Sequence, residues 1–154
     1  KRATGSGVAV LTSGVLSTVT APSGTIVGTS DSQTLTSKTL TNPTVNNYTE
    51  GVVSIGTVTT SSTLDLTNGT LQTATLTAST ACTFTMPTAT AGKSFVLLLK
   101  QAASTGNGTA TFTSVKWNNA GTPTVTATAG KMDIFSFFAD GTNWYGTYTQ
   151  GYTP

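Results

Sequence analysis

Residues 131–149 read KMDIFSFFADGTNWYGTYT, and this stretch decides the expected fold class. On either side of Asp140-Gly141 the side chains alternate with a period of two residues, which is typical of β-strands. An Asp-Gly dipeptide between two such segments predicts a two-residue β-hairpin with a type I′ turn. Aromatic side chains on both segments are placed to pair across the hairpin. The stretch therefore predicts two antiparallel strands.

Similar strand patterns recur along the rest of the chain from residue 51, with turn signals every 8–12 residues or so, roughly the spacing found in sandwiches and barrels. A second dipeptide, Asn68-Gly69, predicts another two-residue hairpin. Residues 94–99, SFVLLL, are almost continuously apolar, so their strand should be central and covered on both faces. The expected strands are residues 52–60, 63–67, 70–77, 80–86, 94–101, 109–117, 123–128, 131–139 and 142–149.

The composition favours strands over helices. Thr occupies about a quarter of the positions, and its branched Cβ favours extended backbone. Charged residues make up only 8% of the chain, so the helix formers Glu, Lys and Arg are scarce. The sequence therefore predicts an all-β protein in which residues 51–154 form an antiparallel, jelly-roll-like β-sandwich.

Residues 1–50 differ in amino-acid composition from the rest of the chain. They contain neither Trp nor Phe, and their aliphatic residues occur singly among Gly, Ser and Thr. Such a segment cannot bury a core of its own, because domains of this size are marginal even with ordinary apolar content. We expect residues 1–50 to form an extended N-terminal arm for anchoring and trimerisation, and residues 51–154 to form the displayed domain.

The arm contains a short repeat. Residues 34–43, TLTSKTLTNP, are one five-residue unit written twice, and Leu35, Leu40 and Val45 fall five positions apart. This spacing fits neither a helix nor a half-buried strand, and Pro43 favours an extended conformation at the residue before it. Three isolated apolar side chains cannot offset the ordering of the backbone, at about 1–2 kcal/mol per residue. Three copies of the chain around one axis could share them, so we interpret all three as assembly residues of a trimer.

Residues that usually carry catalysis or bind metals are few. The chain has no His, and its one cysteine, Cys82, lies in an alternating segment as a small buried apolar residue would. The common zinc sites need several His and Cys ligands, whereas a calcium site built from scattered Asp side chains stays open. We expect no catalytic residue, no metal and no cofactor. The acidic residues are far apart in sequence: Asp31, Glu50, Asp65, Asp133 and Asp140.

Charge and hydropathy also narrow the choice of partner. The net charge is +2 and the basic residues are scattered, which is not the pattern of a nucleic-acid-binding protein. No apolar run approaches the roughly 20 residues of a membrane span. Neither nucleic acid nor a membrane is expected as a partner.

The aromatic residues near the C-terminus allow two interpretations. We expect Trp117 and Trp144 to fill the core of the sandwich. Alternation places Tyr145 on the face opposite Trp144, and exposed aromatic side chains often mark binding sites. Tyr145 and Tyr148 are therefore candidate glycan contacts, with a place in the core as the alternative for both.

From about residue 70 to residue 149 the chain resembles the C-terminal β-domain of many bacteriophage tail-fibre and head-fibre proteins. The segment QTLTSKTLTNPTV, residues 33–45, is similar to TLTNKTLTSPT-like segments that precede or separate β-domains in phage virion proteins. The residues that carry the first resemblance are Gly92, Gln101, Trp117, Pro123, Lys131, Asp133, residues 140–142 (DGT) and residues 144–146 (WYG).

This resemblance implies a virion structural protein without catalysis, a homotrimer on the particle surface that contacts other virion proteins. Because the chain is short, we expect a head fibre or capsid decoration protein anchored through its N-terminal arm. The alternative is a short tail-fibre or tail-tip protein that recognises host surface glycans. An enzyme such as a capsule depolymerase would need clustered carboxylates, which the sequence does not show.

Overall fold

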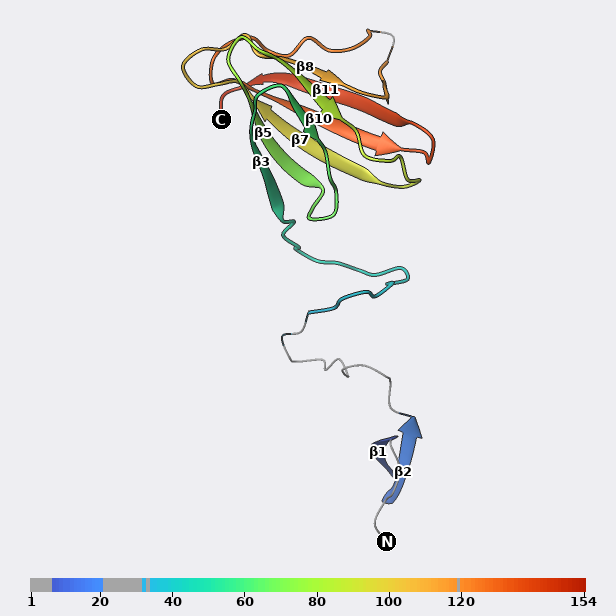
Figure 1. Ribbon diagram of the computed structural model, residues 1–154. Helices are drawn as coiled ribbons and strands as arrows, with labels where there is room; N and C mark the ends of the chain where they lie inside the picture. Colours follow the sequence, from blue (N-terminus) through green and yellow to red (C-terminus); the bar gives the residue numbers. More distant parts are fainter. Residues whose placement is uncertain (1–6, 21–31, 33, 119) are drawn as a thin grey trace. The chain divides into compact units, whose positions relative to one another are not determined.

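The computed structural model describes residues 7–20, 32, 34–118 and 120–154 (Figure 1). Within these ranges every regular element is a β-strand, so the predicted all-β class is confirmed. The chain divides into two compact units, Lys1–Val45 and Asn46–Pro154. The division falls close to the change in composition at residue 50.

The first unit contains a β-hairpin. Strand β1 (Gly7–Thr12) pairs in antiparallel fashion with β2 (Val15–Thr20). The turn is Ser13-Gly14, with φ of 49° and 80°, and positive φ at both central residues is typical of the tight hairpin turn. The sequence predicted an extended arm, and it did not predict this hairpin or its turn. A two-stranded hairpin has no core of its own, and alone it is at best marginally stable. The hairpin is therefore compatible with the low apolar content of this segment.

The second unit contains two sheets (Figure 1). One has six strands in the order β3-β5-β7-β10-β11-β9, and the other has three in the order β4-β6-β8. The strands are β3 (Val52–Val58), β4 (Ser61–Thr63), β5 (Leu71–Leu76), β6 (Ala81–Thr85), β7 (Ser94–Lys100), β8 (Thr109–Phe112), β9 (Val115–Lys116), β10 (Met132–Ala139) and β11 (Trp144–Tyr152).

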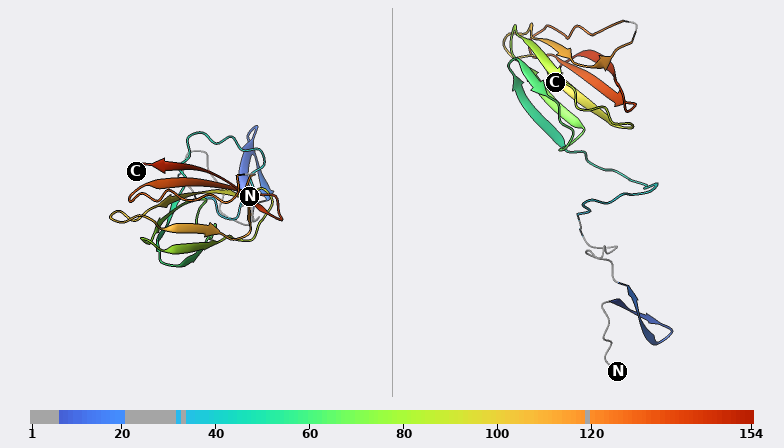
Figure 2. Two further views of the ribbon diagram at one scale, coloured as in Figure 1. Left: turned by 90° about the horizontal axis from the view of Figure 1, so that it is seen from above. Right: turned by 45° about the vertical axis from the view of Figure 1, so that its right-hand side comes forward.

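From β3 to β8 the chain alternates between the two sheets, as the two further views show (Figure 2). Neighbours β3, β5 and β7 are parallel, and so are β4, β6 and β8. This is a solenoid-like winding closed by the antiparallel hairpin β10–β11. The predicted antiparallel jelly-roll sandwich is therefore wrong. Alternation within each strand is the same in both architectures, and only the connections decide whether the chain turns back or crosses to the other layer.

The predicted hairpin at Asn68-Gly69 is also wrong. The strands on either side, β4 and β5, belong to different sheets, so this dipeptide lies in a crossing between layers. Asn68 does not have a positive φ, and that of Gly69 is 155°. A Cβ on Gly69 would lie 2.9 Å from the carbonyl oxygen of Gly51. Glycine is needed here for close backbone approach rather than for a type I′ turn.

The predicted hairpin at Asp140-Gly141 is confirmed in its strands and wrong in its turn type. The last strand pair is Ala139 with Trp144, so the loop has four residues, 140–143. Asp140 Oδ1 accepts hydrogen bonds from the backbone N–H groups of Thr142 (2.8 Å) and Asn143 (2.7 Å). This carboxylate closes the loop in the manner of an Asx-turn.

Two other expected strands differ. Residues 123–128 form no strand, because their backbone is bonded to side chains: Thr126 N–H donates to Asp133 Oδ2 (2.7 Å). Residues 109–117 split into β8 and β9 at Ser114, whose φ is 58°. The two short strands lie in different sheets, so this bend carries the chain between layers.

The core lies between the sheets and is rich in aromatic rings. Phe95 stacks on Phe137 at a centroid distance of 4.7 Å, and Phe112 packs against Phe135 at 4.9 Å. Strand β7 is central, as predicted, with Phe95, Leu97 and Leu99 buried, but its other face is only half-buried. The expectation that this strand is covered on both faces is therefore wrong within the described chain.

Candidate functional site

The expected assembly residues lie in backbone without strands or helices. Leu35, Leu40 and Val45 are 48%, 58% and 58% exposed. The residue two positions after each has a positive φ: 52° at Ser37, 50° at Asn42 and 52° at Asn47. The five-residue repeat of the sequence is therefore a repeat of backbone geometry as well. We call residues 34–48 the pentad repeat.

The conformation of Asn42 corrects one expectation. An extended residue was predicted before Pro43, whereas Asn42 has a φ of 50°. The proline disfavours the right-handed helical region at the preceding residue, and asparagine enters the left-handed region more readily than most residues. Ser37 adopts the same φ without a following proline, so the bend belongs to the repeat and not to Pro43.

Tyr145 is held by a hydrogen bond to the hairpin loop. Its hydroxyl donates to Asp140 Oδ2 at 2.9 Å, and its strand partner is Phe138, which is 55% exposed. The N–H groups of Asn143 and Thr142, with the Tyr145 hydroxyl, lower the pKa of Asp140 to about 2. The hydrogen bond to Asp140 and the negative charge of that carboxylate raise the pKa of Tyr145.

Tyr148 lies on the other side of the same strand and is half-buried. Its ring centroid is 6.1 Å from that of Trp117 and 6.1 Å from that of Phe135. The structure therefore does not bring the two candidate glycan contacts together: Tyr145 faces outward and Tyr148 packs against the core.

The two tryptophans occupy the core region, as predicted. Trp144 is buried and donates from Nε1 to the carbonyl oxygen of Pro87 at 2.7 Å. Trp117 is partly buried and lies over Gly146, where a Cβ would come within 2.5 Å of the indole ring.

The six-stranded sheet presents a largely apolar surface on the side away from the three-stranded sheet. We call this surface the outer face. Between its apolar residues lie Ser and Thr side chains, and across β5, β7, β10 and β11 its one charged side chain is Lys100. The apolar and aromatic residues of the outer face are Val52, Leu71, Val96, Leu98, Met132, Ile134, Phe138, Tyr145 and Tyr152.

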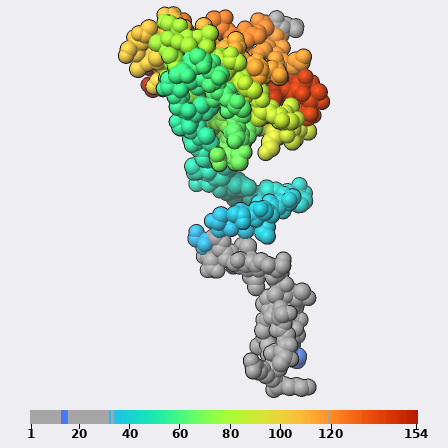
Figure 3. Space-filling model, in the orientation of Figure 1, coloured from blue at the N-terminus to red at the C-terminus, as the bar shows by residue number. Residues whose placement is uncertain are grey.

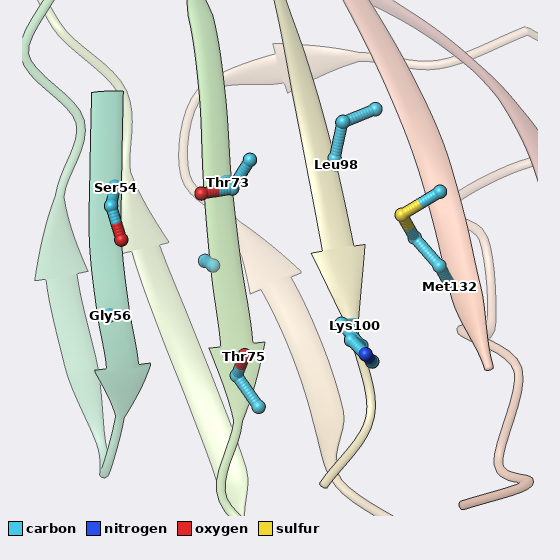
Figure 4. Close-up of a pocket in the computed structure, with 8 residues that line it drawn as sticks. Ser54, Gly56, Thr73, Thr75, Leu98, Lys100 and Met132 are labelled. Carbon is cyan, nitrogen blue, oxygen red and sulfur yellow. The ribbon is translucent and has the colours of Figure 1, made fainter. Parts of the chain in front are cut away.

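Two shallow hollows lie on the outer face. The first, of about 240 Å³, is lined by side chains from four adjacent strands, including Ser54, Leu98, Lys100 and Met132 (Figure 4). The second, of about 160 Å³, lies at the opposite ends of the strands and includes Glu50 and Phe138. Each hollow is lined by a single charged side chain, Lys100 in the first and Glu50 in the second. In the space-filling view, strands β3 and β5, coloured green, lie at the surface of the second unit (Figure 3).

Each of three acidic residues is engaged by nearby backbone. Asp65 accepts from Thr67 and its pKa is lowered by those hydrogen bonds. Asp140 closes its hairpin loop, and the buried Asp133 accepts from Thr126 and from the N–H of Gly151. Asp31 lies outside the described residues. Across the part of the chain that the structure describes, no three potential ligands gather to hold a metal ion.

Cys82 is buried, and its thiol lies 3.1 Å from the carbonyl oxygen of Val58. The prediction of a small buried core residue is confirmed.

Among the described residues, the buried polar side chains are those of Gln72, Gln101 and Asp133, and sequence reasoning missed the roles of all three. Gln101 Nε2 donates to the carbonyl oxygens of Gly108 (2.8 Å) and Thr126 (2.7 Å), and its Oε1 accepts from Gly108 N–H (3.0 Å). Asp133 binds the other side of Thr126. The two side chains replace ladder hydrogen bonds for the strandless segment 123–128. The sequence did contain one signal for the role of Asp133. It is a polar residue at a position where the alternation of its strand predicts a side chain facing the core.

Comparison with protein-family models, with curated proteins and with solved structures gives no match. Among the described residues, no helix is long and apolar enough to cross a membrane. The fold and its surfaces define the class: an all-β protein with a solenoid-like unit, an exposed pentad repeat and a largely uncharged sheet face.

Proposed function

We propose that the chain is a structural component of a bacteriophage virion. In this proposal it is a surface-displayed, homotrimeric head fibre or capsid decoration protein, anchored to the particle through its N-terminal arm. It contacts other virion proteins through the arm and displays the solenoid-like unit. It performs no catalysis and needs no cofactor.

The pentad repeat is the observation that carries this proposal. It presents an apolar side chain once in five residues, and those side chains are 48–58% exposed. Ordering the repeat costs about 1–2 kcal/mol of backbone entropy per residue. Burial of the exposed apolar side chains between copies offsets part of that cost, at about 0.8 kcal/mol for each newly buried CH₂ group. The repeat of positive φ at Ser37, Asn42 and Asn47 gives successive units the same backbone bend, which suits a repetitive contact. The resemblance of residues 33–45 to segments of phage virion proteins agrees with this role.

The test is to find the protein on the particle. Purified virions carrying an epitope tag on the chain should bind antibody at the capsid surface, and averaged images should show three-fold density there. Labelling at the tail would favour the alternative below. Virions that contain none of the chain by mass spectrometry would overturn the proposal.

The second candidate is a short tail-fibre or tail-tip protein that recognises host surface glycans. It is favoured by the exposed pair Phe138 and Tyr145, because the bond to Asp140 fixes the tyrosine ring before any ligand binds. On a glycan array, Tyr145→Ala should abolish binding. Tyr148→Ala should instead lower stability, because that ring packs on Trp117. Absence of any glycan binding by the wild-type protein would dismiss this candidate.

A further inference from the structure

We propose that the outer face of the six-stranded sheet is the surface through which copies of this chain associate into a closed ring. The inference rests on the proposed homotrimeric role and names the surface that holds the trimer's displayed units together. It starts from nine apolar or aromatic side chains that the second unit leaves on one side of a sheet. Parallel strands such as β3, β5 and β7 occur mostly in sheets that are covered on both faces.

The two middle rows of the outer face carry no charge, whereas the row of Met132 also holds Lys100, its direct partner on β7. Leu98 of β7 pairs directly with Ile134 of β10, and the neighbouring rows add Val96 on one side and Met132 on the other. The remaining central positions are Ser and Thr, such as Thr73 and Ser136. A hydroxyl both donates and accepts a hydrogen bond, so this mixture of apolar groups and hydroxyls is complementary to a second copy of itself.

The size of the outer face suits a stable contact. Five strands about 4.8 Å apart and some seven residues long, at about 3.3 Å per residue, give a flat area of roughly 500 Å² per copy. In a ring of three copies that turn this face toward the axis, each copy divides its face between two neighbours. The contact of one copy with the other two then buries about 1,000 Å² in total, which is the lower bound for a specific interface. An apolar centre with charges confined to the rim is also the usual anatomy of such an interface.

The charges at the rim point to a ring of copies. Glu50 lies beside Ser94 and Phe138 at one end of the face, next to strand β5. Across the strands from Phe138, the next residue in the same row is Tyr145 of β11, and the next is Lys116 of the edge strand β9. Glu50, two residues before the edge strand β3, and Lys116 of the edge strand β9 thus lie toward the same end of the outer face.

Cyclic assembly places the β3 edge of one copy beside the β9 edge of the next, and such head-to-tail contacts close into a ring. Each Glu50 then lies near the Lys116 of a neighbouring copy. Every copy of the chain carries both Glu50 and Lys116, so a second copy always offers the opposite charge. A partner of another sequence need not carry charges at these positions.

The experiment measures the mass of the full-length chain by sedimentation over a range of concentrations. The wild type should reach three times the 15.6 kDa of one chain. Glu50→Lys and Lys116→Glu should each weaken assembly by roughly two- to fivefold per contact, as expected for exposed ion pairs. The double variant, with the two charges exchanged, should assemble like the wild type, because opposite charges would again face each other between neighbouring copies.

Leu98→Lys should weaken assembly by more than about tenfold, because it places an unpaired charge at the apolar centre. Leu98→Thr is a milder variant that keeps strand propensity and should weaken assembly less. The matched control is Thr85→Lys, at an exposed position of β6, the central strand of the other sheet. Near-ultraviolet circular dichroism checks that every variant keeps the folded core.

Two results would overturn the proposal: a wild type that sediments as a single chain at every concentration, or Leu98→Lys assembling as readily as Thr85→Lys. Single charge reversals that weaken assembly without rescue in the double variant would show that Glu50 and Lys116 do not meet between copies. These outcomes are separate from detection on virions, so the outer face can fail as an interface while the virion role stands, and the reverse. Because Phe138 and Tyr145 belong to the outer face, a ring of copies would also compete with glycan binding.

Discussion

At the scale of single residues, charge-assisted hydrogen bonds determine the local geometry of the second unit. Asp140 fixes the β10–β11 loop and the Tyr145 ring, and Asp133 anchors a segment without strand pairing. Asp140 is exposed in its loop, whereas Asp133 is buried in a strand.

The pKa of Asp140 should be about 2, well below its ordinary value of 3.8. Because folding lowers this pKa, the stabilisation from the ionised carboxylate is complete above about pH 4 and is lost as the pH falls toward 2. Carbon-detected NMR titration of the carboxyl group measures the value directly. In Tyr145→Phe the pKa of Asp140 should rise but stay low, since the N–H groups of Asn143 and Thr142, the larger causes, remain. An ordinary pKa in the wild type would contradict the loop geometry.

Asp133→Asn should lower the free energy of unfolding by about 1–3 kcal/mol. The carboxylate accepts from Thr126 N–H and Thr126 Oγ1, each at 2.7 Å, and from Gly151 N–H at 3.0 Å. An asparagine NH₂ group would face one of these donors. Denaturant unfolding followed by tryptophan fluorescence gives the value, and Asp65→Asn at an exposed turn is the control, expected to cost less. Equal effects at the two positions would show that burial of Asp133 has no energetic consequence.

At the scale of elements, the backbone of β11 lies so close to an aromatic ring that only glycine fits at one of its positions. Gly146→Ala should destabilise the protein by about 1–3 kcal/mol through overpacking, because its Cβ would lie 2.5 Å from the Trp117 ring. The control is Gly51→Ala, where a Cβ meets nothing within 4 Å and the change should be within about 0.5 kcal/mol. A neutral Gly146→Ala would mean that Trp117 moves aside without cost.

The pentad repeat is testable without changing chain length. The triple variant Leu35→Ser, Leu40→Ser, Val45→Ser should keep the second unit folded while reducing assembly or incorporation into particles, since the exposed apolar groups are lost. Thr36→Ser with Thr41→Ser serves as the matched control. If the triple variant assembles and enters particles as the wild type does, the repeat is a spacer.

At the scale of the whole molecule, the position of each strand in its sheet should determine how well its amides are protected from hydrogen exchange. Strand β7 has hydrogen-bonded neighbours on both sides, whereas β3 and β9 are at the edges of the six-stranded sheet. In hydrogen exchange, amides of β7 and β10 should therefore exchange slowest and those of β3 earlier. Uniform protection across the sheet would indicate that β3 is paired in solution, for example with another copy.

The periodicity of two, the richness in Thr and the turn dipeptides were enough to predict an all-β chain and to place most strands within a few residues. The β10–β11 hairpin and the burial of Cys82 and Trp144 also followed from local pattern, because alternation reports which side of a strand is apolar. Sequence reasoning did not separate Tyr145 from Tyr148 as partners in one site, although residues three apart on a strand face opposite sides.

The sequence by itself determined the class of secondary structure, the position of the change near residue 50 and the period of the pentad repeat, since these depend on neighbours along the chain. Only the tertiary structure decided that β3, β5 and β7 run parallel, that residues 123–128 are held by Gln101 and Asp133, and that no other described part of the second unit covers the outer face. Strand direction and face coverage depend on which distant segments meet, and in every strand the alternation of side chains is the same whichever neighbour it has.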